Sequence, residues 1–465
     1  MQIKIVLLLC AVVLLAYLPS LNNGFILDDK SIIVNNLKVR SLKNAPEIFT
    51  SSLYNSGQMY RPMQVLSYAF DYKLWGLNPF GFHLGNVILH ILNVILVFYL
   101  LNKIYPTVAF GASLIFAVHP INTSVVSYIS GRADLLVTFF MLSSLALFQR
   151  KRIILSILLA IPAYFCRENS LILFLLIILI SATSGIKLRY CIPFIFLSLV
   201  YLVLRLIIIS KTTVVLDTNM PFLLNFINYI NVILNYIVVL VLPLKLHLFR
   251  SVMFIADLIE LRAIVCFAFV ILSAFIVFKL RKNKLIIFSI CWFIITLSPV
   301  FFILDSYLWL KRAIMAESWL YLPAIGFFIL IILIKNKLKI IGTILLSLVI
   351  VFYISIIWMN NIFWHNNILA YQNILENSCA GSLVRKNLIK EYLQLKLYDC
   401  AFQEIKKFSK EFPESSDRYI LQGDYYLGMG ATLAARESFK NALRINRFNI
   451  EVINKLKSIE GLDAT

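Results

Sequence analysis

The chain has 465 residues, of which 61% are hydrophobic and only 14% are charged. This composition excludes a globular enzyme with a single anchor and indicates a polytopic membrane protein. The net charge of +20 would suit a nucleic-acid partner. However, the basic residues lie in short loops between hydrophobic runs, as the positive-inside rule expects, so we expect no nucleic-acid binding.

Hydrophobic runs follow one another along most of the chain. The first, residues 3–19, resembles the core of a signal peptide, but no cleavage site with small residues follows it. We therefore expect it to be retained as the first span. The others lie near residues 84–102, 107–121, 133–149, 153–165, 170–183, 190–209, 222–243, 262–279, 285–304, 319–334 and 339–358. Several are shorter than the roughly 20 residues that a full crossing needs.

Basic clusters predict which loops face the cytoplasm. They are Lys103, residues 149–152, Lys187 with Arg189, residues 279–284 and residues 335–339. Over the first seven runs the clusters fall in alternate loops, which places the first loop, residues 20–83, outside. The clusters at Lys187 and at residues 279–284 are both predicted to face the cytoplasm, which requires an even number of crossings between them. Three hydrophobic runs lie between them, which is an odd number. Either residues 222–243 enter the membrane without crossing it, or a short crossing lies near 245–260. We favour about 11 crossings and a C-terminus outside.

Two adjacent carboxylates, Asp28 and Asp29, follow the first hydrophobic run. Charged groups near hydrocarbon are costly, so they usually have a function. A carboxylate here can act as a general base on a hydroxyl or amide acceptor, or it can hold a metal. The alternative is a solvated turn after a helix. Later in the same loop, Met63, Leu66, Phe70 and Leu74 share one helical face, which predicts a helix lying in the membrane interface.

The other outer loops contain further ionisable residues. Arg61 is a candidate phosphate clamp, because a guanidinium group matches phosphate oxygens, although it could equally bind lipid headgroups. Asp134 is placed to orient Arg132 or a substrate hydroxyl, unless it forms an ion pair that stabilises its loop. Arg167 and Glu168 lie between two apolar runs and form either a functional site or a self-satisfied pair. His83, His119, Arg312 and Glu317 also lie in outer loops.

These positions suggest one site assembled from several outer loops beside the membrane. The sequence contains no glycine-rich phosphate loop, so a soluble nucleotide bound by backbone amides is not the expected donor. A lipid-phosphate donor that enters from the bilayer fits better. The cysteines show no metal-binding spacing, although Cys379 and Cys400 could pair in an oxidising compartment.

From Trp364 onward the composition becomes polar and helical in pattern, and it repeats at an offset of 34 residues. The matched or typical positions are Tyr392, Ala401, Pro413, Gly423, Tyr426, Ala435, Phe439 and Ala442. Their spacing is typical of tetratricopeptide helix pairs. We therefore expect residues 1–364 to form the membrane domain and residues 365–465 to form a short repeat domain, a kind of surface that usually binds peptide or protein.

Several motifs occur in the order of one known family. They are Asn23-Gly24-Phe25 with Asp28-Asp29 and Asn35, Tyr60-Arg61-Pro62, residues 77–90, His119-Pro120, residues 131–134, Arg167-Glu168-Asn169 and residues 317–323. With these motifs the chain resembles the transmembrane-and-tetratricopeptide (TMTC-like) O-glycosyltransferases of the GT-C superfamily, including their bacterial relatives. Residues 61–134 are the most specific part of the resemblance.

The resemblance implies an all-α, polytopic membrane bundle of GT-C type. It also implies a polyprenyl- or dolichyl-phosphate-linked sugar donor, an acceptor hydroxyl, most often on a protein, at the outer or lumenal face, and inversion at the anomeric carbon. Asp28 or Asp29 would be the base. The donor phosphate and substrate would be held by Arg61, His83, His119, Arg132, Asp134, Arg167, Glu168 and Glu317. Enzymes of this type that use monophosphate-linked sugars generally need no metal, so we expect no cofactor.

The sequence departs from the family in two ways: its repeat tail is very short, and position 167 is Arg where many relatives carry Lys. Transfer to a lipid or polysaccharide, and a non-catalytic membrane scaffold, remain alternatives. A transporter is disfavoured because the ionisable residues gather at the outer ends of the spans. Low Gly and Pro with abundant Ile, Asn and Lys suggests a bacterial source. The expected location is then the inner membrane, with the site and the repeat domain outside the cytoplasm.

Overall fold

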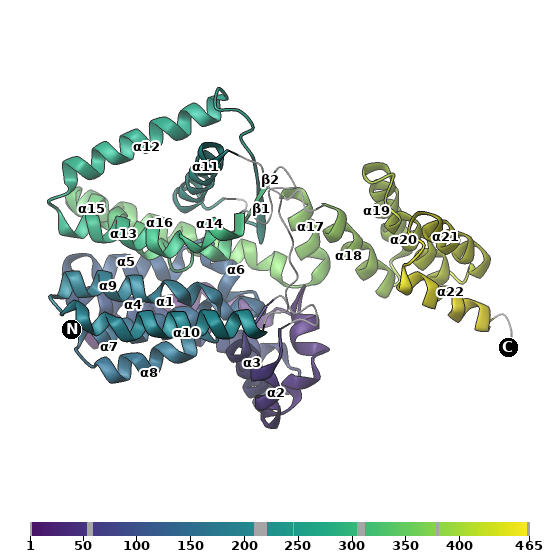
Figure 1. Cartoon of the computed structure of the whole chain (residues 1–465), viewed down its shortest axis with the longest axis horizontal. Helices are drawn as coiled ribbons and strands as arrows, with labels where there is room; N and C mark the ends of the chain where they lie inside the picture. The colour runs from purple at the N-terminus through teal and green to yellow at the C-terminus, as the bar shows by residue number, and fades with distance from the viewer. Residues whose placement is uncertain are drawn as a thin grey trace. The chain divides into compact units, whose positions relative to one another are not determined.

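We describe the fold from a computed structural model, in which residues 2–53, 59–208, 221–244, 246–304, 312–377 and 381–462 are described. The chain divides into two compact units, Met1–His365 and Asn366–Thr465. The described part is almost entirely helical (Figure 1), and its two short strands pair with each other. The expected all-α fold with many apolar helices is confirmed.

The first unit is a bundle of apolar helices, many of them joined by short turns, with a long loop between α1 and α4. The apolar helices of the bundle are α1 (Gln2–Tyr17), α4 (Pro79–Ile104), α5 (Pro106–Val118), α7 (Arg132–Gln149), α8 (Ile153–Tyr164), α9 (Leu173–Ser184), α10 (Ile192–Ile208), α11 (Phe222–Val241), α12 (Leu261–Leu280), α13 (Lys284–Leu297), α15 (Ala324–Lys337) and α16 (Lys339–Asn361). The elements between them include η2 (Lys30–Val34), η3 (Leu37–Arg40), α2 (Ala45–Thr50), α3 (Pro62–Trp75), α6 (Thr123–Val126), η6 (Ile129–Gly131), η8 (Leu188–Cys191), α14 (Pro299–Leu304) and η10 (Glu317–Leu320), with β1 (Phe249–Met253) and β2 (Arg312–Ala316).

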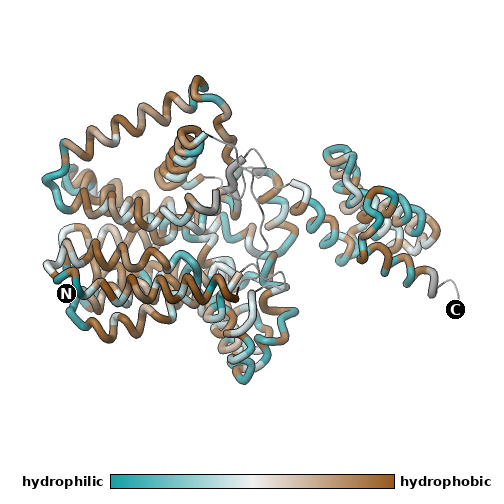
Figure 2. The backbone as a smooth tube through the Cα atoms, in the orientation of Figure 1, coloured by the Kyte–Doolittle hydropathy of each residue, from teal (hydrophilic) through white to brown (hydrophobic). Residues whose placement is uncertain are grey.

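Local sequence signals explain where these helices begin and end. The Asn78 side chain accepts a hydrogen bond from the Phe80 backbone N–H at 3.1 Å and caps α4, whose first residue is a proline. Gly185, with φ of +64°, ends α9 in the left-handed conformation that glycine tolerates. Between such ends the helices are apolar on most faces (Figure 2). An all-round apolar surface is stable only against other helices or lipid.

Eight described helices are long and apolar enough to cross a membrane, or nine if α5 and α6, which are bent by 50° relative to each other, count as one span. Helices α8 and α9 are apolar but shorter. These criteria confirm a polytopic chain and give fewer spans than the expected 11, so the number of crossings stays a prediction. Figure 1 shows α11 nearly end-on beside α12, which is seen from the side, so the two helices cross at a steep angle.

The alternative of an extra crossing near residues 245–260 is wrong for the described residues. This segment contains β1, which pairs antiparallel with β2. After β1 the chain packs along α11. There the Asn228 side chain accepts from the Ile255 backbone N–H at 2.7 Å and donates to the Ile255 carbonyl at 3.0 Å. An asparagine that faces a buried backbone satisfies both of its polar groups in this way. The apolar residues of this segment therefore cover α11 rather than form a span.

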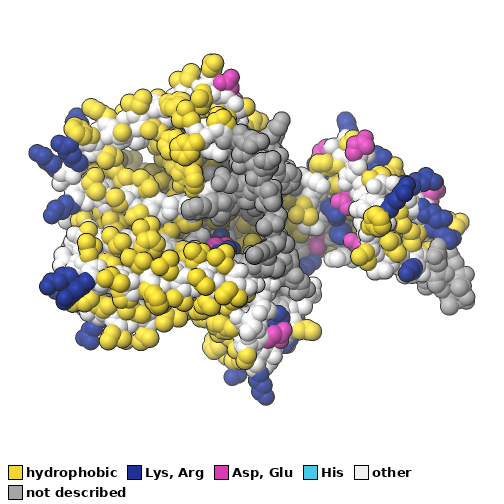
Figure 3. Space-filling view, viewed as in Figure 1, with side chains coloured by type: hydrophobic (Ala, Val, Ile, Leu, Met, Phe, Trp, Pro, Cys, Tyr) yellow, Lys and Arg dark blue, Asp and Glu magenta, His cyan; other side chains and the backbone are white. Residues whose placement is uncertain are grey.

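The two ends of the bundle differ in charge. Figure 3 shows several groups of Lys and Arg side chains at the left end of the first unit, and a few more on the first loop at its lower tip. We call the left end the basic end; it contains the turns that follow α4, α7, α9, α12 and α15. The long first loop with α2 and α3, together with β1, lies at the opposite end (Figure 1), which we call the loop end. All the predicted site residues from the first loop therefore lie far from the basic turns.

Helix α3 turns its apolar face outward. Phe70 and Leu74 are 55% and 58% exposed, as expected for a helix that rests on a membrane surface. The opposite face is buried and mixed in character. Val65 and Tyr68 pack in a hydrophobic cluster, while the Gln64 amide donates to the Ser130 carbonyl at 3.0 Å and the Tyr68 hydroxyl donates to the Ile129 carbonyl at 2.9 Å. The exposed apolar side chains support the predicted position in the interface. Apolar packing and polar contacts together hold the other side of the helix to the first loop and to η6.

The second unit consists of helical hairpins: α17 (Asn367–Asn377), α18 (Gly381–Gln394), α19 (Tyr398–Glu411), α20 (Asp417–Gly428), α21 (Thr432–Ile445) and α22 (Ile450–Leu462). A Cβ atom at Gly423 would lie only 2.5 Å from a ring carbon of Phe439, so glycine permits the close packing of α20 on α21. Ala401 and Ala435 are fully buried. The small and aromatic positions behave as a repeat requires, and the tetratricopeptide assignment stays a prediction. Cys379 lies outside the described residues, so its pairing with Cys400 also stays a prediction.

Candidate active site

The two neighbouring aspartates of the first loop have different environments. Asp29 is fully buried; one oxygen accepts from the Ile26 backbone N–H at 3.1 Å, and the other accepts from the backbone N–H and hydroxyl of Ser130 at 3.0 and 2.5 Å. Burial raises the pKa of Asp29 to about 7. Asp28 is exposed, and its backbone N–H donates to the Tyr128 hydroxyl at 3.3 Å. Asp29 therefore holds the loop to η6, while Asp28 presents its carboxylate at the surface.

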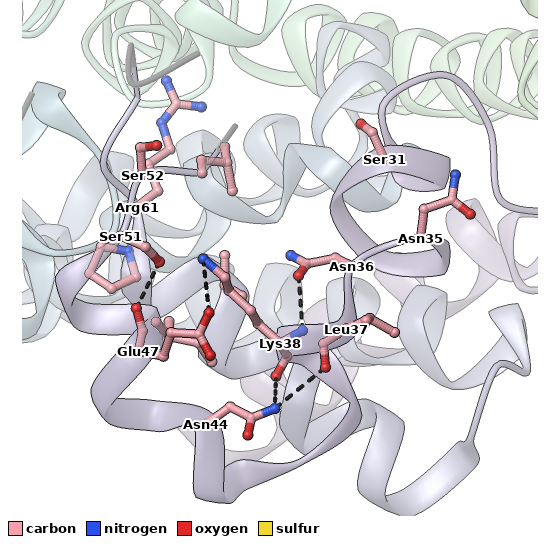
Figure 4. A pocket seen from close by; sticks show the side chains of 14 residues that line it. Ser31, Asn35, Asn36, Leu37, Lys38, Asn44, Glu47, Ser51, Ser52 and Arg61 are labelled. Carbon is pink, nitrogen blue, oxygen red and sulfur yellow. Dashed lines mark hydrogen bonds and ion pairs between the residues drawn. The ribbon is translucent and has the colours of Figure 1, made fainter. Parts of the chain in front are cut away.

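A cavity of about 570 Å³ lies within the first loop, between η2, η3, α2 and the start of α3. Its polar lining consists of Ser31, Asn35, Asn36, Lys38, Asn44, Glu47, Ser51, Ser52 and Arg61 (Figure 4). The Ser31 hydroxyl donates to the Asp28 carbonyl at 2.9 Å, so Asp28 lies one turn before the cavity wall. Amide and hydroxyl groups arranged around a cavity suit a ligand rich in hydroxyl groups.

Polar contacts within the loop hold this cavity in shape. Lys38 and Glu47 form an ion pair at 3.4 Å across it, and the Asn44 amide donates to the Lys38 carbonyl at 3.1 Å (Figure 4). The Arg61 guanidinium points away from these residues, toward the helical bundle. Arg61 therefore connects the cavity with Glu168 and the charged groups around it.

Five ionisable residues from four segments form an arginine cluster at the loop end: Arg61, Asp134, Arg167, Glu168 and Arg205. Glu168 accepts from Arg61 at 2.8 and 3.4 Å and lies 3.8 Å from Arg205. Arg167 forms an ion pair with Asp134. The structure thus brings together four of the predicted residues and adds Arg205. That residue lies inside the run 190–209, where a lone cation among apolar residues could have signalled it.

The cluster contains three guanidinium groups and only two carboxylates, so it has one positive charge in excess. The Nε of Arg167 is buried and has no hydrogen-bond partner among the described residues. Arginine has five N–H donors in a planar fork that matches phosphate oxygens. A site with excess cationic charge and an unused donor can therefore bind an added anion, and its carboxylates keep the guanidinium groups in position until that anion binds.

Arg132 does not belong to this cluster, and the expectation that Asp134 orients it is wrong. The Arg132 guanidinium is buried, pairs with Asp71, and donates to the Asn86 side chain at 2.7 Å and to the Phe82 carbonyl. All three of its nitrogens are therefore satisfied inside the protein. Arg132 joins α7 to α3 and α4 and has a structural role in this arrangement.

The two predicted histidines are both buried. The His119 ring Nε2 lies 3.1 Å from the Leu240 carbonyl, and its Nδ1 accepts from the Ile121 backbone N–H at 3.3 Å, which assigns the proton to Nε2. Its contacts are internal and give no opening to a substrate. His83 lies against the backbone of Asn23 and Gly24 without a well-formed hydrogen bond to either. The substrate roles of both histidines stay predictions.

Glu317 follows β2 and is almost completely buried. One carboxylate oxygen accepts from the His247 backbone N–H at 3.0 Å and from Arg250 at 2.7 Å, and the other oxygen has no partner among the described residues. Burial raises the pKa of Glu317 to about 7. Glu317 therefore fixes the segment before β1 against η10. The side chain of Arg312, on the neighbouring strand, lies outside the described part.

Replacing Glu317 with Gln is expected to weaken the pH dependence of stability. The folded-state pKa of about 7 lies above the ordinary value of 4.5, so folding takes up a proton between these values and stability falls as the pH rises from 4.5 to 7. The upper limit of this loss is roughly 3 kcal/mol. Gln keeps the acceptor for His247 and Arg250 and cannot ionise. Thermal unfolding in detergent between pH 5 and 8 should show a smaller decrease than in the unmodified chain. If the loss of stability with rising pH were the same in both chains, groups other than Glu317 would cause it. The control is Glu437→Gln, at an exposed position.

Among the described residues, no three His, Cys, Asp or Glu side chains gather as a metal site requires. The expectation that the chain acts without a metal stays a prediction, because it concerns the reaction rather than the arrangement of side chains.

Curated proteins similar to the chain are protein O-mannosyl-transferases. The chain is 36% identical over 163 residues to F38B6.6 of Caenorhabditis elegans, 38% over 149 residues to TMTC1 of Homo sapiens, and 31% over 189 residues to TMTC3 of Homo sapiens. These matches cover 32%, 29% and 37% of the chain, and 24%, 17% and 20% of the relatives. The chain thus spans less than a quarter of the length of each of these three relatives. No family model and no solved structure matches. The predicted resemblance to TMTC-like O-glycosyltransferases is confirmed.

Proposed function

We propose that the chain is a GT-C-type glycosyltransferase that moves a sugar from a polyprenyl-phosphate-linked donor to a hydroxyl group of a protein. The observation that carries this proposal is the position of Arg61. Its side chain lines the cavity beside the Asp28 turn, and its guanidinium group belongs to the arginine cluster. A base, a hydroxyl-binding cavity and a phosphate-binding group are therefore contiguous. Because the relatives are named as mannosyl-transferases, mannose is the first sugar to test.

In the proposed reaction the acceptor hydroxyl attacks the anomeric carbon while Asp28 takes its proton. The bond between that carbon and the phosphate oxygen breaks, and polyprenyl phosphate leaves with the electron pair. Attack from the face opposite the leaving group inverts the anomeric configuration. Arg61 and Arg167 balance the negative charge on the leaving phosphate. Asp29 is a positioning residue, because its two oxygens hold the loop through Ile26 and Ser130.

The charge difference between the two ends of the bundle supports an extracytoplasmic site. Basic turns remain on the cytoplasmic side of a membrane, and the first loop lies at the end opposite to them (Figure 3). The proposed reaction therefore takes place outside the cytoplasm, and for a bacterial chain the membrane would be the inner membrane.

The direct test compares glycopeptides of envelope proteins from cells with and without the chain by mass spectrometry. The proposal expects a hexose-sized mass on Ser- or Thr-containing peptides that disappears with the chain and returns when the chain is restored. A loss confined to glycolipid or polysaccharide would replace the protein acceptor by one of those classes. Unchanged profiles of all three would contradict a transferase and favour the scaffold alternative.

A further inference from the structure

Two adjoining cavities lie at the basic end of the bundle, opposite the candidate active site. One has a volume of about 760 Å³ and lies between the turn that joins α7 to α8 and the turn that joins α9 to η8. The other, of about 530 Å³, lies between the ends of α4, α7 and α9. Both are lined by Lys151, which adopts φ of +60° in the tight turn before α8. Together they form one concave surface, which we call the basic hollow.

The basic hollow is lined by cations and by no carboxylate. Its charged residues are Lys103, Arg150, Lys151, Arg152, Lys187 and Arg189. None of these six forms an ion pair with a carboxylate in the part of the chain that the structure describes. The cationic groups repel one another across a shared cavity, and an anion between them would remove that repulsion.

Helix ends account for only part of this charge. Helices α4, α7 and α9 all end at the basic hollow, and the C-terminal end of a helix carries roughly half of an elementary negative charge. Three such ends neutralise fewer than two of the six cations. The positive-inside rule explains why cations lie on this side of the membrane, but not why they surround a cavity.

The wall beside these cations is aliphatic and exposed. Ile154, which lines the larger cavity, is 75% exposed, and Leu188 and Ile192 on the facing turn are each 63% exposed. Ile154 lies at the start of the short apolar helix α8, and Leu188 and Ile192 lie at the start of the candidate span Leu188–Ile208, so all three are placed to meet lipid. A ligand that satisfies the whole surface therefore combines a phosphate group with hydrocarbon chains.

We propose that the basic hollow binds an anionic phospholipid, with the headgroup phosphate between Lys151, Lys187 and Arg189 and the acyl chains along Ile154 and Leu188. Basic pockets between helices on the cytoplasmic side are suited to such headgroups. This lipid is distinct from the sugar donor, because the hollow and the arginine cluster lie at opposite ends of the bundle. The proposal does not depend on the proposed function.

Native mass spectrometry of the full chain in detergent tests it, with phosphatidylglycerol and phosphatidylcholine added separately. We expect tighter binding of phosphatidylglycerol, weakened by about tenfold or more in a variant with Lys151→Gln, Arg152→Gln, Lys187→Gln and Arg189→Gln. The matched control removes four cations from another turn at the same end: Lys279→Gln, Arg281→Gln, Lys282→Gln and Lys284→Gln. It is expected to change the affinity by less than about threefold.

Three results would overturn the proposal. Equal loss in both variants would show a diffuse charge effect rather than a site. Equal binding of phosphatidylcholine would show that the hydrocarbon chains alone bind. Displacement of phosphatidylglycerol by millimolar inorganic phosphate would show a small-anion site. If the fourfold variant does not fold, the pair Lys151→Gln with Lys187→Gln replaces it, and Lys151→Arg with Lys187→Arg is expected to retain the lipid.

Discussion

Asparagine in place of Asp28 is expected to lower the rate of sugar transfer by roughly 10²- to 10⁴-fold, the usual contribution of a general base. Asn has nearly the size of Asp but accepts no proton. The exposed position of Asp28 predicts unchanged protein yield and unchanged thermal unfolding. The measurement is the initial rate with purified chain, polyprenyl-phosphate hexose and a Ser/Thr peptide.

Two comparisons make this result interpretable. Asp29→Asn places an amide N–H among the donors from Ile26 and Ser130, so it should lower stability together with activity. Asp257→Asn, at another exposed aspartate, should change the rate by less than about twofold. If Asp29→Asn were stable and inactive while Asp28→Asn stayed active, the roles of the two aspartates would be reversed.

Methionine in place of Arg132 is expected to destabilise the chain by about 3–5 kcal/mol, because it leaves the buried Asp71 carboxylate without its cation. The double variant Arg132→Met with Asp71→Leu removes both charges and should regain much of this loss. Denaturation in mixed detergent, followed by circular dichroism, measures both. The Arg262–Glu260 pair is partly exposed to solvent, so Arg262→Met should cost less than about 1 kcal/mol.

The outcome also decides between two roles of Arg132. If Arg132→Met were as stable as the unmodified chain and lost only transfer activity, Arg132 would contact substrate, as the sequence motif predicts. If Arg132→Met lost stability and the double variant regained it, Arg132 would instead hold the first loop in position through Asp71.

The sequence predicts the helical membrane fold well, because long apolar runs have few other solutions. It also predicts that Arg61, Asp134, Arg167 and Glu168 belong to one site, since alternate loops reach the same side of the membrane. It does not predict their partners. Asp71 lies on the polar face of an amphipathic stretch, and only the fold shows that this face is buried against Arg132 rather than solvated.

Other misses have similar physical causes. The two aspartates of the first loop look equivalent in sequence, and the left-handed turn at Leu27, with φ of +49°, leaves one exposed and the other buried. Arg250, the partner of Glu317, lies in a segment whose apolar residues suggested a crossing. Both cases depend on contacts between distant parts of the chain, which local periodicity does not contain.

The outward apolar face of α3 has a consequence for the choice of acceptor. In the predicted position of α3 in the membrane interface, the exposed Phe70 and Leu74 enter the headgroup layer, and this fixes the height of the neighbouring cavity above the bilayer. A hydroxyl on the far side of a folded domain cannot descend to that height. Under the proposed function, the chain should therefore modify juxtamembrane or extended segments, and moving one target residue away from its membrane anchor should abolish its modification.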